Sequence, residues 1–126
     1  MNWLGVLGVA IGGACGSVVR YGVGRLVGVY FPGVASLVST GLVNLVGAFF
    51  LGVVVTRFQA SPKPNAWALL LGVGFCGGLT TFSTLAMELA DLMHAKRFWG
   101  MVGYGIGSLV LGILAFLLGV WVAGRS

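Results

Sequence analysis

The segment from Gly77 to Thr84, Gly-Gly-Leu-Thr-Thr-Phe-Ser-Thr, places two glycines and four hydroxyl side chains in a stretch that is otherwise apolar enough to cross a membrane. Lipid offers no hydrogen bonds, so backbone groups freed by a helix break at that depth must be satisfied by protein, bound ions or water. The composition therefore predicts a broken helix that forms an ion or substrate site.

Arg20 and Asn44 are the next polar residues inside long apolar stretches. Arg20 has no acidic residue near it in sequence, so it either snorkels to the lipid headgroups or lines a positive vestibule that concentrates anions. Asn44 offers two N–H donors and one carbonyl acceptor, and it shares a helix face with Thr40. It either joins two helices by a hydrogen bond or donates to an anion in a pore.

Tyr104 and Ser108 are four residues apart and therefore lie on one helix face. Ser108 either bonds back to the carbonyl of Tyr104 or lines an ion path. In the second case the path is a row of weak donors that also includes Asn44, Phe82, Ser83 and Thr84.

The chain has too few ionisable side chains for the usual enzyme sites. It contains only two acidic residues and one histidine, and no Ser-His-Asp, Cys-His or paired-carboxylate set is evident among them. We therefore predict that it is not an enzyme. Glu88 is expected near the headgroups together with Asp91, in either a structural or an ion-handling role.

The elements that carry these residues are predicted to be transmembrane helices. Hydrophobic residues make up 59% of the 126 residues, in continuous runs rather than the alternating pattern of a barrel. A crossing needs about 20 residues, so the chain has room for four in a single domain, residues 1–126. The predicted helices are Trp3–Val29, Ala35–Phe58, Ala66–Leu92 and Phe98–Ala123. Short connections join them at Tyr30–Val34, Gln59–Asn65 and Met93–Arg97.

Six of the seven basic residues are divided evenly between the two sides of this arrangement, and the seventh, Arg20, lies deeper in the first span. Arg57, Lys63 and Arg125 share one side, and Arg25, Lys96 and Arg97 share the other. The positive-inside rule then has no bias to act on, which favours dual topology and an antiparallel dimer, unless lipid or a partner fixes one orientation. The net charge of +5 is expected to meet lipid headgroups rather than nucleic acid.

The 23 glycines are predicted to let the helices approach closely, because helices in lipid gain no hydrophobic drive toward one another. Close approach is expected at glycines on three helices, which form four-residue ladders on the first and fourth and thin the second. They are Gly8, Gly12 and Gly16 on the first, Gly41, Gly47 and Gly52 on the second, and Gly103 and Gly107 on the fourth.

Four blocks of the sequence resemble the Fluc (CrcB) family of fluoride channels. The most specific is Gly74-Phe-Cys-Gly-Gly-Leu-Thr-Thr-Phe-Ser-Thr84 with Glu88. The others are Gly12-Gly-Ala-Cys-Gly16 with Arg20-Tyr21, Val43-Asn44 with Gly47 and Phe49, and Gly103-Tyr-Gly105 with Ser108.

The resemblance implies an antiparallel homodimer with two pores in the cell (inner) membrane, which exports fluoride passively and limits its toxicity in the cytoplasm. It also implies a structural Na⁺ at the dimer centre, held by backbone carbonyls of Gly77 and Thr80. Asn44 and Phe82 would line the ion path and Arg20 the vestibule. The remaining path residues would be Ser83, Thr84, Tyr104 and Ser108.

Leu85 departs from the family motif, which usually has a second phenylalanine at this position. This departure leaves open a non-conducting subunit of a heteromeric fluoride channel. A small multidrug-type antiporter, which shares the size and the antiparallel pairing, is the other alternative. The first helix lacks the acidic residue that such an antiporter uses to exchange a cation for protons.

Overall fold

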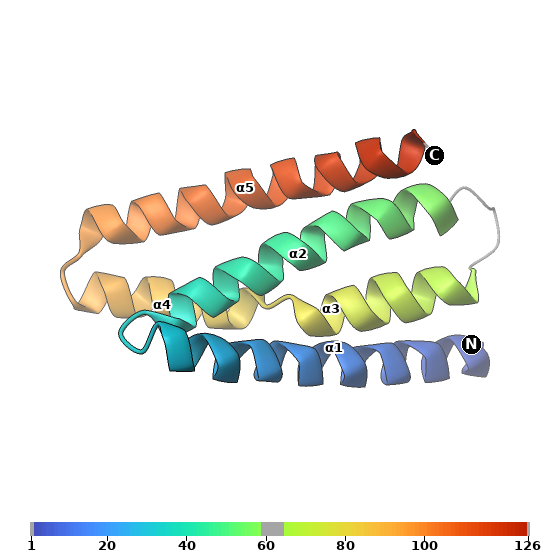
Figure 1. Cartoon of the computed structure of the whole chain (residues 1–126), viewed down its shortest axis with the longest axis horizontal. Helices are drawn as coiled ribbons and strands as arrows, with labels where there is room; N and C mark the ends of the chain where they lie inside the picture. The colour runs from blue at the N-terminus through green and yellow to red at the C-terminus, as the bar shows by residue number, and fades with distance from the viewer. Residues whose placement is uncertain (1, 59–64, 126) are drawn as a thin grey trace.

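The computed structural model describes residues 2–58 and 65–125, and every regular element in them is helical (Figure 1). Four helical stretches are long and apolar enough to cross a membrane, which confirms the predicted all-α multi-pass membrane protein. Their ends fall within two residues of the predicted ones, while most of the predicted connection Gln59–Asn65 lies outside the described residues. The elements are α1 (Trp3–Tyr30), α2 (Ala35–Phe58), η1 (Ala68–Cys76), α3 (Gly77–Leu79), α4 (Phe82–His94) and α5 (Phe98–Gly124).

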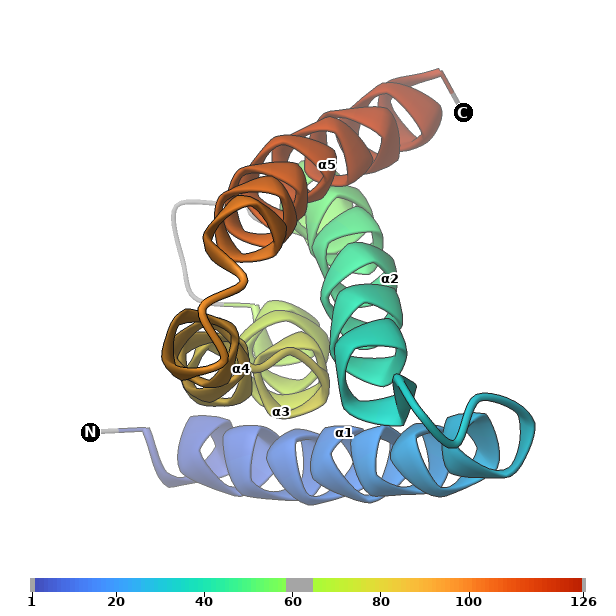
Figure 2. The ribbon, with the colours of Figure 1, turned by 90° about the vertical axis from the view of Figure 1, so that its left-hand side faces the viewer.

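Three of these elements, η1, α3 and α4, follow one another along the third span. Helix α1 packs against η1 and α3, while α2 lies between the third span and α5 (Figure 2). The described N- and C-terminal ends lie at one end of the bundle, and the connections 31–34 and 95–97 lie at the other (Figure 1). This is the arrangement expected for four crossings.

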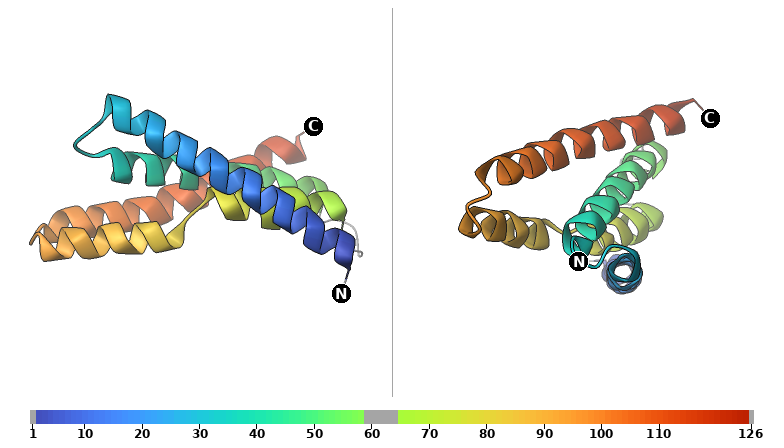
Figure 3. Two further views of the ribbon diagram at one scale, coloured as in Figure 1. Left: turned by 90° about the horizontal axis from the view of Figure 1, so that it is seen from below. Right: turned by 60° about the vertical axis from the view of Figure 1, so that its left-hand side comes forward.

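The third span is interrupted, as its glycines and hydroxyls predicted. Thr80 has a ψ of 157°, and Thr81 has φ −149° and ψ 115°, so both residues are extended between α3 and α4. The break is visible as an extended link between two helical segments in the left-hand view of Figure 3. Before it, η1 is wound as a wide π-helix, a feature that hydropathy alone does not predict.

Glycine packing follows the prediction at Gly12 and Gly16 on the first helix and at Gly47 and Gly52 on the second, whereas a Cβ added to Gly41 would meet nothing within 4 Å. A Cβ added to Gly12 would collide with the carbonyl oxygen of Leu70, and one at Gly16 would collide with that of Phe75. Between α2 and α5, a Cβ at Gly52 would meet the carbonyl oxygen of Phe116 in the same way. Backbone against backbone is the closest approach that two helices can make, so these contacts fix the bundle.

The prediction that Gly103 and Gly107 pack as a ladder is wrong for the described part of this chain. A Cβ added at either position would meet nothing within 4 Å. Gly119, in the C-terminal half of α5, makes the close approach to α2 instead, where a Cβ would collide with the carbonyl oxygen of Phe49. The spacing of glycines therefore predicted that α5 can pack closely against a neighbour, but it did not predict which face of α5 makes the contact.

Candidate functional site

The break in the third span redirects two backbone N–H groups, those of Thr81 and Thr84. In a continuous helix the N–H of Thr81 would bond the carbonyl of Gly77. It donates instead to Oδ1 of Asn44 at 2.7 Å. The N–H of Thr84 turns to the Thr81 hydroxyl at 3.2 Å, which caps the start of α4. The carbonyls of Gly77 and Thr80 thereby lose their usual helical partners.

Asn44 is bonded to both backbone groups of Thr81. Besides accepting from the N–H, its Nδ2 donates to the Thr81 carbonyl at 3.1 Å. The sequence left open whether Asn44 joins helices or lines a pore. The structure shows the first role, and one Nδ2 proton remains because the amide carries two.

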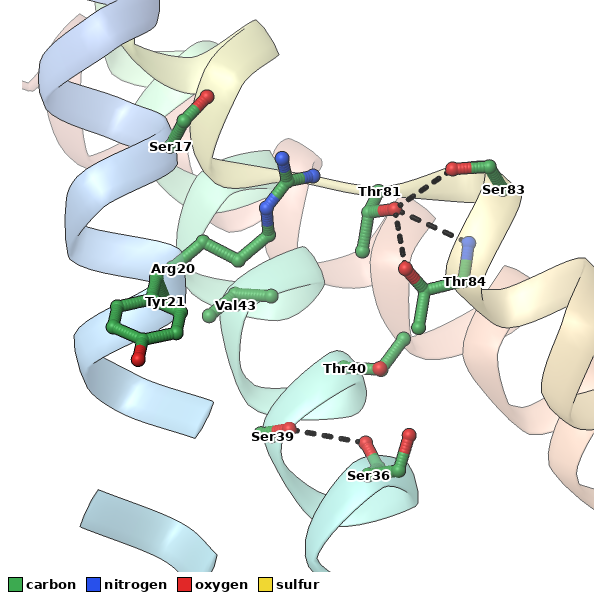
Figure 4. Close-up of a pocket in the computed structure, with 10 residues that line it drawn as sticks. All are labelled: Ser17, Arg20, Tyr21, Ser36, Ser39, Thr40, Val43, Thr81, Ser83 and Thr84. Atoms are coloured by element: carbon green, nitrogen blue, oxygen red, sulfur yellow. Dashed lines mark hydrogen bonds between the residues drawn. The ribbon is translucent and has the colours of Figure 1, made fainter. Parts of the chain in front are cut away.

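Arg20 reaches from α1 to the same break. Its Nη1 donates to the carbonyl oxygen of Thr80 at 3.1 Å, across 60 positions in sequence. The side chain is half-buried and points toward the extended link rather than away from the protein (Figure 4). This orientation does not match the snorkelling alternative for Arg20, and a role in an anion vestibule stays a prediction.

A polar cavity of about 390 Å³ surrounds this arginine. Its lining contains one guanidinium, a single apolar side chain and eight hydroxyl side chains, with no carboxylate (Figure 4). The structure therefore brings together three of the predicted path residues, Arg20, Ser83 and Thr84. The hydroxyls belong to Ser17, Tyr21, Ser36, Ser39, Thr40, Thr81, Ser83 and Thr84.

Phe82 and Ser108 lie elsewhere, in an apolar groove of about 800 Å³ along α4 and α5. Phe82 is 81% exposed, so in a single chain its ring has few protein neighbours. Asn44 and Leu85 line the same groove. A smaller cavity of about 260 Å³ is lined by Asn44, Ser108 and Tyr104, so Asn44 and Ser108 line both spaces.

Glu88 corrects the sequence interpretation. We expected it near the headgroups, but it is 4% exposed and sits inside the bundle. Its Oε1 accepts from Thr40 at 2.7 Å and from Ser36, and its Oε2 accepts from the Tyr104 hydroxyl at 2.6 Å. Ser36 and Thr40, four residues apart on one face of α2, were the available signal for a buried polar partner.

Tyr104 and Ser108 therefore have different surroundings. The Tyr104 hydroxyl is committed to Glu88, whereas Ser108 forms no hydrogen bond with any residue that the structure describes. The alternative in which Ser108 bonds back to the Tyr104 carbonyl is not what the structure shows. Ser108 is thus the freer donor of the pair.

Gly77 and Thr80 line a further cavity of about 340 Å³, together with Gly47 and Cys76. Within residues 2–58 and 65–125, no three His, Cys, Asp or Glu side chains gather as they would around a transition metal. A cation at this point would have to use backbone and hydroxyl oxygens, the ligands that suit hard ions.

Comparison with known proteins gives one consistent result. A family model described as CrcB-like protein, Camphor Resistance (CrcB), matches residues 7–120. The protein named fluoride-specific ion channel FluC from Gloeothece citriformis is 37% identical over 123 residues, 98% of this chain and 99% of that protein. Fluoride-specific ion channel FluC 2 from Rhodococcus jostii is 44% identical over 116 residues, 90% of this chain and 94% of its own length. These names describe channels, which supports the prediction that the chain is not an enzyme.

Proposed function

The chain belongs to the CrcB family of membrane proteins, and on that basis we propose that it is a fluoride-selective channel. It would let fluoride leave the cell passively across the cell membrane and so limit fluoride toxicity in the cytoplasm. The observation that carries this proposal is the cavity of about 390 Å³, in which one guanidinium and many hydroxyls face each other without a carboxylate.

Such a lining suits a small, strongly hydrated anion. Fluoride must exchange its water for N–H and O–H donors before it can enter a narrow path. Arg20 carries five N–H groups, of which the structure commits one to Thr80. The hydroxyl protons of Ser36 and Thr40 are taken by Glu88, so Thr84, Ser17 and Arg20 are the donors best placed to face an anion.

We place the ion path between this cavity and the groove on α4 and α5. Arg20, Ser83 and Thr84 would receive the ion, and Asn44 would pass it toward Phe82 and Ser108, with Tyr104 close by. Two facts support this order: Asn44 lines both spaces beyond the break, and Ser108 has an uncommitted hydroxyl. Aromatic ring edges such as that of Phe82 carry partial positive charge and can face an anion.

The path is open on one side in a single chain. Phe82 is 81% exposed, and only Gly119 and Ala123 are buried on α5. A second copy of the chain would cover this face and complete the path. Together with the even division of basic residues, this supports an antiparallel, dual-topology homodimer.

The same dimer would place a structural Na⁺ where the third spans meet. Gly77 and Thr80 carbonyls suit such an ion chemically, because the break removes their helical partners and the Thr80 oxygen keeps one lone pair beside its bond from Arg20. One chain offers two of these oxygens, and a second copy offers the matching pair. The ion would neutralise carbonyl dipoles that lipid cannot satisfy.

Two other functions make different predictions. A small multidrug-type antiporter would exchange organic cations for protons, yet α1 contains no acidic residue. A non-conducting subunit of a heteromeric channel is favoured by one observation, Leu85 in the groove beside Phe82.

Fluoride efflux from liposomes that contain only this purified chain distinguishes the fluoride channel from the antiporter and from the non-conducting subunit. We expect rapid, electrogenic fluoride efflux with no chloride efflux and no need for a proton gradient. Export of an organic cation driven by a proton gradient would identify the antiporter. A folded protein that passes no ion alone, but does so with a second homologous chain, would identify the subunit.

A further inference from the structure

We infer that Arg20 is a positioning residue for the cation site at the break, in addition to any contact with fluoride. This inference rests on the proposed function, because it concerns the Na⁺ site proposed at Gly77 and Thr80. The carbonyl of Thr80 is the group that both roles share: Arg20 donates to it from one side at 3.1 Å.

The geometry links two separate spaces. Arg20 lines the polar cavity of about 390 Å³, and Thr80 lines the neighbouring cavity of about 340 Å³ that contains Gly77. A carbonyl oxygen has two lone pairs, so the bond from Arg20 leaves one for a cation. The hydrogen bond therefore joins a residue of the predicted anion vestibule to a residue of the predicted cation site.

The peptide between Thr80 and Thr81 has no helical ladder to hold it, since both residues are extended. Its orientation depends on side chains from other helices, namely Arg20 on the Thr80 carbonyl and Asn44 on both backbone groups of Thr81. The Thr80 hydroxyl turns back to the Cys76 carbonyl at 2.9 Å and so does not hold the Thr80 carbonyl itself. Arg20 is thus the side chain that fixes the proposed ligand oxygen.

Removing Arg20 has opposite expected effects on Na⁺ binding, depending on whether charge repulsion or positioning of the Thr80 carbonyl dominates. A guanidinium close to a cation site repels the cation, so a neutral residue would strengthen Na⁺ binding if repulsion dominated. If positioning dominates, the freed carbonyl turns and Na⁺ binding weakens. Residues that orient a metal ligand commonly change metal affinity by about 10- to 100-fold when they are replaced. The sign of the change therefore separates the two roles.

The test is the Tm of the purified, detergent-solubilised protein as Na⁺ replaces N-methylglucamine at constant ionic strength. Wild type should be stabilised by Na⁺. In Arg20→Met, the Na⁺ concentration needed for half of the Tm rise should increase about 10-fold or more. Arg25→Met, which removes an arginine five residues along α1, is the matched control and should titrate like wild type. Arg20→Gln is neutral with a shorter side chain and serves if Arg20→Met does not fold; the same loss is expected.

Unchanged or tighter Na⁺ dependence in the Arg20 variants would overturn the inference, as would a wild-type Tm that does not respond to Na⁺. Neither result bears on fluoride conduction, which the liposome efflux of the wild-type chain tests separately. If wild type conducts fluoride but shows no response to Na⁺, the cation site and the role of Arg20 fail while the channel proposal stands.

Discussion

The side-chain amide of Asn44 bonds both backbone groups of Thr81: it accepts from the N–H at 2.7 Å and donates to the carbonyl at 3.1 Å. The two residues lie 37 positions apart, on α2 and on the break of the third span. The side chain thus replaces the helical hydrogen bonds that the break removes. Asn44, which is predicted to line the ion path, therefore also holds the backbone at the break of the third span.

We expect Asn44→Asp to abolish fluoride efflux. A fixed carboxylate in a poorly hydrated path repels an anion, and the low local dielectric strengthens the repulsion. Because Asp cannot donate to the Thr81 carbonyl, the variant should also be less stable, by about 1–3 kcal/mol. Liposome flux and thermal unfolding measure the two effects.

Asn65→Asp is the matched control for this substitution. Oδ1 of Asn65 accepts from the N–H of Trp67 at 2.9 Å, and a carboxylate oxygen can do the same. Flux close to that of wild type is expected for it. Wild-type flux through a folded Asn44→Asp protein would remove Asn44 from the ion path.

Leu85→Phe is expected to raise fluoride throughput or selectivity. The phenylalanine ring edge offers partial positive charge to a dehydrated anion, which leucine methyl groups do not. Leu85 lines a groove of about 800 Å³, so the larger side chain has room that a tight core would deny it. Overpacking would instead appear as a loss of about 1–3 kcal/mol in stability.

Leu89→Phe is the control, because it adds the same ring volume one turn further along the same groove, at a position where the family motif has no phenylalanine. Its flux should stay near the wild-type level. A Leu85→Phe variant as stable as its parent, with no gain in flux or selectivity, would show that the missing aromatic does not limit this channel.

Tyr104→Phe should destabilise the protein by about 1 kcal/mol, because Glu88 loses one hydrogen bond to its buried carboxylate. The hydroxyl donates to Oε2 at 2.6 Å. Tyr21→Phe is the control, since Tyr21 is 71% exposed and should change the Tm little. Equal Tm values for the Tyr104 and Tyr21 variants would contradict the buried network, and a flux measurement would show whether that network also affects conduction.

Gly52→Ala should destabilise the α2–α5 contact by about 1–3 kcal/mol, because the new methyl group meets the Phe116 carbonyl and the backbones must separate. Gly124→Ala, on α5 with nothing within 4 Å of the added carbon, should be neutral. Thermal unfolding of both variants tests the contact. A tolerated Gly52→Ala would mean that the two helices do not approach this closely in the membrane.

Dual topology predicts that a single cysteine added at the C-terminus is labelled from both sides of the membrane in intact cells. The basic residues are divided three against three, so insertion has no preferred direction. Cys15 and Cys76 must first be replaced, and an impermeant reagent then reports each side. Labelling from one side only would exclude the antiparallel arrangement.

The sequence by itself determined the four spans and the position of the break. Span length depends on local hydropathy, and a run such as Ala35–Phe58 is apolar whatever its neighbours are. Likewise, Gly77-Gly78 followed by hydroxyl residues weakens a helix locally, and the extended residues Thr80 and Thr81 occur where that pattern predicts.

Only the tertiary structure decided which polar groups meet. Arg20 bonds Thr80, and Glu88 bonds Thr40 and Tyr104, between helices whose relative rotation no local pattern encodes. The rotation is set by backbone contacts at particular glycines, and spacing cannot tell a glycine that faces a neighbour from one that does not. For this reason local spacing predicts neither that Gly103 and Gly107 lack a close neighbour within the single chain nor that Glu88 is buried within the bundle.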